Sequence, residues 1–409
     1  MEPFIKDQIA ATLKYAPYHI AAGHLKKPSS PEAEQARRRL GGFIKGICHP
    51  SENFGQVKGV GLEWNRADVP FPFDENGRIR AEYAQWKESM RRYRANGIRV
   101  FAVTPYPRTY IKYGIDPRTP GGEARVREIA AFMINDLRGI AGGFQITNEM
   151  GNLYFTKPMT MRQAARFIGI QLEAMHPLRG DVLIGYNSPG PQCDLHALMR
   201  PWHKCCDYVG IDIYLGCFIA LGSWMYMHEA LLRYLWSMTG KPVILCEFGY
   251  ISGGVPKTPE EKRAVLQRYG VSSEKEAREN AGQFLETLKA LRPVMYGRVT
   301  KNASGDPLDF LFKSFYKNHF YSELPKRVAI RKYPHTPEGQ ADFYRDIFPR
   351  LYKLPFVLGA FIYKWNDKDS CSHCGQEDCP TEARWGLVDR NGDEKPAYYA
   401  VRDALAKIN

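Results

Sequence analysis

The sequence predicts a barrel of eight parallel strands that alternate with helices, and three observations support this prediction. Eight short apolar runs of strand length recur along the 409 residues, helical patterns separate most of them, and several runs are apolar almost throughout. Continuous apolar runs are typical of parallel strands buried on both faces. Strand and helix alternating eight times indicates an α/β protein with a (β/α)8 TIM barrel fold.

The predicted strands are defined by their apolar runs and by the turn residues between them. In chain order they cover residues 43–50, 61–69, 98–106, 144–150, 182–189, 208–216, 242–250 and 356–367. Apolar residues at helical spacing follow within 83–93 and within 164–175. Thr336 followed by Pro337 is a typical helix start, and it precedes the eighth strand. About a dozen residues separate the first two strands, so that connection is the least regular of those predicted.

One connection is much longer than the others. After the seventh strand, 84 residues (251–334) pass before the helix at Thr336. We expect helices beginning at Thr258 and over 273–291, and irregular structure over 300–334. Connections of this length are usually lids or small subdomains. The predicted organisation is therefore an N-terminal helical extension (1–40) and a catalytic barrel (41–409) in which 251–334 forms a lid or insertion subdomain.

Composition and charge exclude some classes of protein. The net charge is +13, but the basic residues are scattered and no nucleic-acid motif accompanies them, so solvated helix faces are the favoured interpretation. An acidic substrate remains open. No run reaches the roughly 18 apolar residues of a membrane span. The first 20 residues lack the apolar core of a signal peptide, and nine cysteines favour free thiols, so we expect a cytoplasmic protein without membrane or nucleic-acid partners.

Two predicted strands end in a glutamate, in the strings FQITNEM (144–150) and PVILCEFGY (242–250). A carboxylate directly after a buried strand is costly unless it is paired or has a function. Glu149 and Glu247 lie 98 residues apart, so they suit two strands that deliver both side chains to the same end of one sheet. A retaining glycosidase needs this arrangement, with two carboxyl groups about 5–5.5 Å apart.

The other strand ends supply the polar and aromatic side chains that a sugar site needs. An arginine and a tyrosine can keep one carboxylate ionised. An amide can hold a ring hydroxyl, and a tryptophan face suits the apolar face of a pyranose. We therefore predict that the substrate contacts Arg66, Tyr106, Asn148, Asn187, Tyr214 and Trp365.

Taken together, these residues resemble a known family. The pair Asn148-Glu149 after the fourth strand, Glu247 after the seventh, Arg66 and the tail WGLVDRNGDEKPAYYAVRDAL (385–405) are similar to glycoside hydrolases of clan A, the large group of retaining (β/α)8 enzymes. The resemblance covers roughly residues 43–405. It implies that Glu149 is the acid/base and Glu247 the nucleophile.

The resemblance also implies roles for three neighbours of the glutamates. Arg66 would support the nucleophile, Tyr214 would contact it, and Trp365 would be the aromatic residue after the eighth strand. The segment 251–334 and the cysteines near 371–379 lie outside the family pattern, and no substrate family is indicated.

The sequence therefore predicts a retaining β-glycosidase that works by double displacement and requires no cofactor for catalysis. Glu247 should stay charged beside Arg66, while the negative charge of Glu247 should raise the pKa of Glu149. The lid favours exo action on small glycosides or oligosaccharides. An endo-β-glycanase and a non-catalytic carbohydrate-binding barrel are the alternatives. A metal-dependent hydrolase is disfavoured because His49 is the only histidine at the strand ends. The sugar and the oligomeric state stay open.

A cysteine cluster follows the eighth strand. Cys371, Cys374 and Cys379 lie in CSHCGQEDC, and two cysteines two residues apart have the spacing of zinc ligands. A fourth ligand is missing from this string, and Cys217 or Cys48 are candidates for it. A structural zinc ion and free thiols are both open interpretations.

Overall fold

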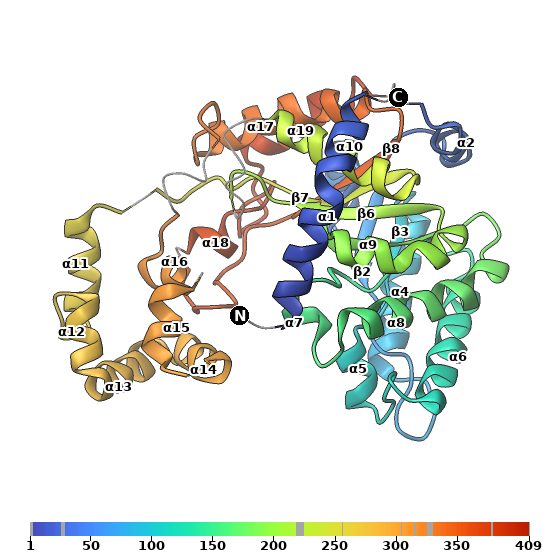
Figure 1. Ribbon diagram of the computed structural model, residues 1–409. Helices are drawn as coiled ribbons and strands as arrows, with labels where there is room; N and C mark the ends of the chain where they lie inside the picture. Colours follow the sequence, from blue (N-terminus) through green and yellow to red (C-terminus); the bar gives the residue numbers. More distant parts are fainter. Residues whose placement is uncertain are drawn as a thin grey trace.

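Eight parallel strands close into a barrel in chain order, and β8 pairs with β1 (Figure 1). The structure is a computed structural model that describes residues 3–25, 29–217, 225–255, 257–303, 305–314, 316–324, 330–377 and 379–408. The strands are β1 (Ile44–Cys48), β2 (Trp64–Asp68), β3 (Arg99–Val103), β4 (Ala141–Ile146), β5 (Leu183–Pro189), β6 (Tyr208–Ile213), β7 (Val243–Phe248) and β8 (Val357–Ile362). The eight-stranded barrel predicted from the apolar runs is confirmed.

Helices precede, surround and extend the barrel. They are α1 (Pro3–Leu25), α2 (Pro31–Leu40), α3 (Phe54–Gly59), α4 (Ala81–Ala95), α5 (Pro107–Lys112), α6 (Pro120–Asp136), α7 (Leu153–Thr156), α8 (Met161–Met175), α9 (Cys193–Met199), α10 (Tyr226–Thr239), α11 (Pro259–Gln267), α12 (Glu274–Glu279), α13 (Ala281–Leu291), α14 (Pro293–Asn302), α15 (Pro307–Lys313), α16 (Tyr316–Tyr321), α17 (Pro337–Tyr352), α18 (Pro380–Ala383) and α19 (Pro396–Leu405), with 3-10 turns at His176–Leu178 and Arg200–Cys205. Among the described residues, no helix is both long and apolar enough to cross a membrane.

The fourth strand differs from its prediction. It begins at Ala141 and ends at Ile146, whereas the apolar run suggested 144–150. Thr147 and Glu149 have positive φ angles of 56° and 49°, a conformation that β-strands do not contain. The chain therefore leaves the sheet before Glu149, and this glutamate projects from a turn above the strand end.

One end of the barrel is closed by α2. Its residues Ala33, Ala36 and Leu40 pack in the same buried cluster as the inward side chains of the barrel. The Arg37 side chain donates to the carbonyl oxygens of residues 352, 354 and 357, which lie between α17 and β8. Because α2 enters β1 directly, it lies at the amino ends of the strands and leaves their carboxyl ends open.

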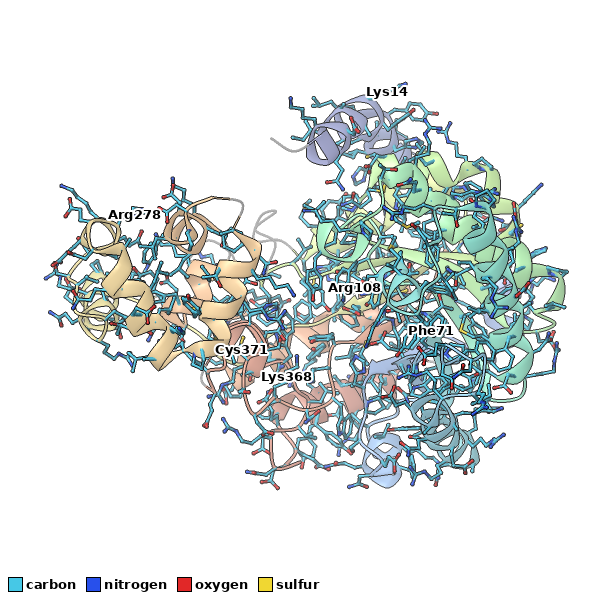
Figure 2. The ribbon with its side chains drawn as sticks, turned by 90° about the horizontal axis from the view of Figure 1, so that it is seen from below. Lys14, Phe71, Arg108, Arg278, Lys368 and Cys371 are labelled. Carbon is cyan, nitrogen blue, oxygen red and sulfur yellow. The ribbon has the colours of Figure 1, made fainter. Side chains whose placement is uncertain are left out.

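The segment after β7 forms a helical lobe that lies beside the barrel in both views, with α11 to α15 in yellow and orange (Figures 1 and 2). The lobe has a hydrophobic cluster of its own, which includes Phe284, Leu288 and Phe320. Two expectations for it need correction. The helix expected over 273–291 is divided at Asn280 into α12 and α13, and the stretch expected to be irregular contains α15 and α16. Residues 325–329 of that stretch lie outside the described residues.

Candidate active site

The carboxyl ends of β2, β4, β5, β6 and β7 bring one group of polar side chains together. Glu247 lies within β7 and is held there by parallel pairing to β6, where Asp212 is its register partner. Glu149 reaches the same place from the turn after β4. One carboxyl oxygen of each of the three acids lies within 4.8 Å of one oxygen of the other two. The sequence prediction that the two glutamates meet agrees with this geometry.

Glu247 is surrounded by groups that favour its ionised form. Arg66 Nη1 donates to Glu247 Oε1 at 2.6 Å, and the Tyr214 hydroxyl donates to Oε2 at 2.5 Å. The Arg66 side chain is 2% exposed and that of Glu247 is 12% exposed, so water screens this ion pair little. A cation and a hydroxyl donor in a poorly solvated site stabilise a carboxylate strongly. Arg66 and Tyr214 thus both contact Glu247, and the roles predicted for them stay a prediction.

Arg66 is fixed by further contacts on its other nitrogens. Its Nε donates to Gln145 Oε1 at 2.9 Å, and its Nη2 donates to Asn148 Oδ1 at 2.7 Å. Nη1 also lies 3.7 Å from Cys48 Sγ. The sequence analysis missed Gln145. A glutamine inside the apolar run of β4 was the available signal, because a buried amide needs a hydrogen-bond partner. The guanidinium therefore has one orientation available, which fixes the position of Glu247.

The backbone and the side chain of Glu149 have different partners. Its N–H donates to Asn187 Oδ1 at 2.9 Å, which holds the turn above β4 against β5. The side chain hydrogen-bonds with Asn152 and Asp212. Burial raises the pKa of Glu149 to about 8, with the negative charge of Glu247 as the second cause. We predicted the direction of this shift from the charge of Glu247 alone, whereas loss of hydration is the larger cause.

Asp212 is a third acid that the sequence analysis did not select. It is 2% exposed, and its Oδ2 accepts from Asn187 Nδ2 at 2.7 Å. Burial, Glu247 and Glu149 together raise the pKa of Asp212 well above its usual range. An aspartate inside the apolar run YVGIDIYLG was the available signal, because a buried acid needs a partner. Asp212 therefore lies beside both glutamates in a place that disfavours its charged form.

Tyr106 lies at the edge of this group. It is half-buried just before α5, and its ring stacks on Phe155 at 5.1 Å between centroids. Burial followed by the charges of Asp68 and Glu247 raises the pKa of Tyr106. The residue therefore lies near the carboxylates, and its contact with a substrate stays a prediction.

Trp365 does not join the group. It is 1% exposed and packs edge-on against Tyr398, 6.2 Å away, in the core under α19. Two other aromatic rings, Tyr363 and Trp385, pack edge-on against Tyr214, with centroids 5.9 and 5.1 Å away. Tyr214 is the residue whose hydroxyl donates to Glu247. The prediction placed Trp365 at the end of a strand over 356–367, whereas β8 ends at Ile362, three residues before it.

The helical lobe contacts the barrel at α7, which follows the turn that carries Glu149. The Tyr154 hydroxyl, on α7, hydrogen-bonds with Arg108 and with Arg298 of α14, and the Arg108 contact lowers the pKa of Tyr154. The Arg108 guanidinium also lies 4.6 Å from the centre of the Tyr154 ring. Arg108 is labelled on the barrel side in Figure 2. The lobe therefore reaches the edge of the site through α14.

A group of potential metal ligands lies apart from the carboxylates. Cys371, Cys374, Cys379 and His319 are buried, and one ligand atom of each lies within 4.8 Å of the other three. His319 is on α16 of the lobe and supplies the fourth position. The two residues considered for that position lie elsewhere: Cys48 contacts Arg66, and Cys217 is buried after β6.

Comparisons with known proteins give no match to a family model or to a curated protein. Solved structures do match. The GH53 catalytic domain of Ignisphaera aggregans has a TM-score of 0.56 at 16% identity, over 89% of this chain and 96% of that one. A family 39 glycoside hydrolase of Bacteroides cellulosilyticus has a TM-score of 0.53 at 13% identity, over 93% of this chain and 65% of that one.

A GH2 β-galacturonidase of Eisenbergiella tayi has a TM-score of 0.51 at 14% identity. The match covers 90% of this chain and 51% of the β-galacturonidase, so the chain spans about half of that protein's length. The fold is thus one that glycoside hydrolases of several families share. At these identities the likeness extends to the fold, and the substrates named belong to those proteins.

Proposed function

We propose that this protein is a retaining β-glycosidase, and one observation carries the proposal. Two glutamates lie within 4.8 Å of each other in opposed environments. Glu247 is paired with Arg66 and Tyr214, whereas burial raises the pKa of Glu149 to about 8. At pH 7 the pair thus supplies one carboxylate and one carboxylic acid. A short separation of this kind suits the retaining mechanism, because the inverting one needs room for a water molecule.

In the first step, Glu247 attacks the anomeric carbon while the proton of Glu149 goes to the leaving oxygen. The glycosidic C–O bond breaks, and an ester forms between the sugar and Glu247. As negative charge leaves Glu247, the pKa of Glu149 falls and the proton is released more easily. In the second step Glu149, now ionised, takes a proton from water, and that water displaces Glu247 from the sugar.

Asn148 supports this mechanism by the direction of its amide. Its Oδ1 accepts from Arg66 and from Asn187 Nδ2, each at 2.7 Å. Among the described residues nothing accepts from the Asn148 NH2 group. That group is therefore available for a ring hydroxyl, and such hydrogen bonds strengthen in the oxocarbenium-like transition state.

We propose exo action on small glycosides or oligosaccharides, because the lobe contacts α7, the helix that follows the turn carrying Glu149. Arg298 of α14 contacts Tyr154 of α7, and this contact supports a lid over one side of the site. The reaction uses no cofactor, since Arg66 supplies the positive charge beside the nucleophile. Nine free cysteines support a reducing compartment such as the cytoplasm.

A panel of α- and β-nitrophenyl glycosides, neutral and acidic, tests the proposal. We expect hydrolysis of at least one β-glycoside. Glu149→Gln should lower its kcat by roughly 10²–10⁴-fold, the range for loss of a general acid, and Glu247→Gln should remove nearly all turnover. Glu63→Gln is the matched control, because Glu63 precedes β2 at the opposite end of the barrel and should be silent. No turnover on the whole panel, or full activity in the Glu247 variant, would refute the assignment.

A further inference from the structure

The buried group of three cysteines and one histidine has the shape of a tetrahedral metal site. His319 Nδ1 lies 3.3 Å from both Cys371 Sγ and Cys379 Sγ, and Cys374 Sγ completes a set within 4.8 Å. With Zn–S near 2.3 Å and Zn–N near 2.0–2.1 Å, a tetrahedral zinc ion places its ligand atoms about 3.5–3.8 Å apart. All three cysteines are free thiols, so a disulfide does not explain their closeness.

The local backbone is arranged to present the sulfurs. Gly375, directly after Cys374, has a φ of 74°, which turns the chain back so that Gly375 N donates to Cys371 O at 2.8 Å. Within that turn, the backbone N–H of His373 donates to Cys371 Sγ at 3.4 Å. Thr381 Oγ1 lies 3.6 Å from Cys379 Sγ. Such outer contacts orient metal ligands and are typical of built sites.

The ligands come from two parts of the chain that α17 and β8 separate in the sequence. His319 belongs to α16 of the lobe, and the cysteines belong to the loop between β8 and α18. Cys371, labelled in Figure 2, lies at the side of the lobe that faces the barrel. All three cysteines belong to the hydrophobic cluster of the lobe, although they follow the last barrel strand. A metal ion here would therefore connect the lobe to the barrel.

The loop that carries the cysteines is connected to Glu247 by a series of contacts. Two residues after Cys379, the carbonyl of Thr381 accepts from Trp385 Nε1 at 2.8 Å. Trp385 packs against Tyr214, whose hydroxyl donates to Glu247. The position of the cysteine loop thus fixes one wall of the site.

We propose that Cys371, Cys374, Cys379 and His319 bind one structural Zn²⁺ ion that ties the helical lobe to the loop after β8. Four protein ligands leave no open position, so the ion stabilises the structure and takes no part in the chemistry. The set of three thiolates and one imidazole is among those that select zinc.

Metal analysis of the full chain, purified under reducing conditions without added zinc, tests the site directly. We expect about one zinc per chain. Cys374→Ser and His319→Gln should each lower the bound zinc by at least about tenfold, since even loss of an outer contact costs about 10–100-fold in metal affinity. Cys205→Ser, a buried cysteine elsewhere, should keep the full amount. Zinc near zero in the wild type, or full zinc in Cys374→Ser, would overturn the proposal.

Two further measurements do not depend on the variants folding. Wild-type protein stripped of zinc and reloaded with Co²⁺ should show the visible bands and sulfur-to-metal charge transfer of tetrahedral cobalt thiolate. A spectrum without charge transfer would overturn the ligand set. Limited proteolysis of the stripped protein should cut first within 257–324 or 366–383. Unchanged cleavage would overturn the tie between lobe and barrel. Neither readout requires activity, so a failed glycosidase assay leaves this test intact.

Discussion

The two glutamates are chemically identical, but their neighbours differ. Glu247 receives a cation from Arg66 and a hydroxyl from Tyr214. Glu149 is turned by its positive φ into a poorly hydrated place beside two other acids, where its charged form is disfavoured. Environments that push two titrating groups apart identify the acid and the base.

Substitutions of Asp212 test how this third acid affects Glu149. Because its pKa is raised well above its usual range, we expect Asp212 to hydrogen-bond with Glu149 as a neutral acid that adds no charge. Asp212→Asn preserves both shape and neutrality. We expect kcat to stay within about tenfold and the alkaline limb of the pH profile to stay near 8. Asp212→Ala removes the hydrogen bond and should cost roughly 10–100-fold, as expected for about 1.5–3 kcal/mol.

The pH profile of kcat/KM distinguishes a neutral Asp212 from an ionised one. An ionised Asp212 would raise the pKa of Glu149 by its negative charge. In that case Asp212→Asn would move the alkaline limb down by about a unit or more. A shift of that kind would contradict the neutral state of Asp212.

Several residues of the site could be read from the sequence, and others could not, for physical reasons. Glu149, Glu247, Arg66 and Tyr214 lie toward the carboxyl ends of the predicted strands, where a polar residue stands out. Asp212 and Gln145 lie inside apolar runs, where the strand pattern hides them. Only the free-energy cost of burying a polar side chain marks them as residues that need a partner. His319 was missed because the cysteines that it meets lie 52 and 60 residues further along the chain.

At the scale of elements, α2 shows how the chain closes the barrel away from the site. The helix begins with the cap Ser30, followed by Pro31, and ends at Gly41 with a left-handed φ of 75°. Its apolar residues enter the barrel, and Arg37 ties it to the segment between α17 and β8. The end of the barrel opposite the candidate active site is therefore closed by one short helix.

Arg37→Ala should lower the free energy of unfolding by about 2–3 kcal/mol, because backbone carbonyls at the start of β8 lose a charged donor. The neighbouring Arg38→Ala is the matched control. Arg38 is 72% exposed and forms only a surface ion pair, so its loss should stay within about 0.5 kcal/mol. Denaturant titration of both variants measures this. Equal losses would contradict the sealing role of α2, and kcat should be unchanged in both.

The strands were predictable because parallel strands buried on both faces leave continuous apolar runs, as the fully buried β6 and β8 show. Strand ends were less predictable. The end of β4 is set by the left-handed turn at Thr147, and a non-glycine residue at positive φ carries no sequence signal. The short helices α15 and α16 are stabilised mainly by packing in the hydrophobic cluster of the lobe. Their own sequences lack a clear helical pattern, so the sequence analysis predicted irregular structure there.

At the scale of the whole molecule, two hydrophobic cores lie side by side, one in the barrel and one in the lobe (Figure 1). The loop after β8 belongs to both, since it leaves the barrel and then packs into the lobe. Cys371, Cys374 and Cys379 come after the boundary expected at residue 334, and they also pack in the cluster of the lobe. The carboxylates lie at the strand ends that face this junction.

Activity of the whole molecule should depend on pH in a defined direction. Because the pKa of Glu149 is raised to about 8, its proton is present at pH 7 and is lost as the pH rises through 8. We therefore expect kcat/KM to fall on the alkaline side with an apparent pKa near 8. For Glu149→Gln, the residual activity should lack this limb. An alkaline limb below pH 6 in the wild type would contradict the role of Glu149 as the acid.

The central claim is that Glu247 forms a covalent bond with the sugar. The 2-deoxy-2-fluoro analogue of whichever aryl β-glycoside the enzyme hydrolyses slows both steps, so the ester should accumulate. Digestion and mass spectrometry of the inactivated protein should then find one sugar on the peptide that contains Glu247. A label on another residue, or turnover of the analogue with no labelled peptide, would contradict the account.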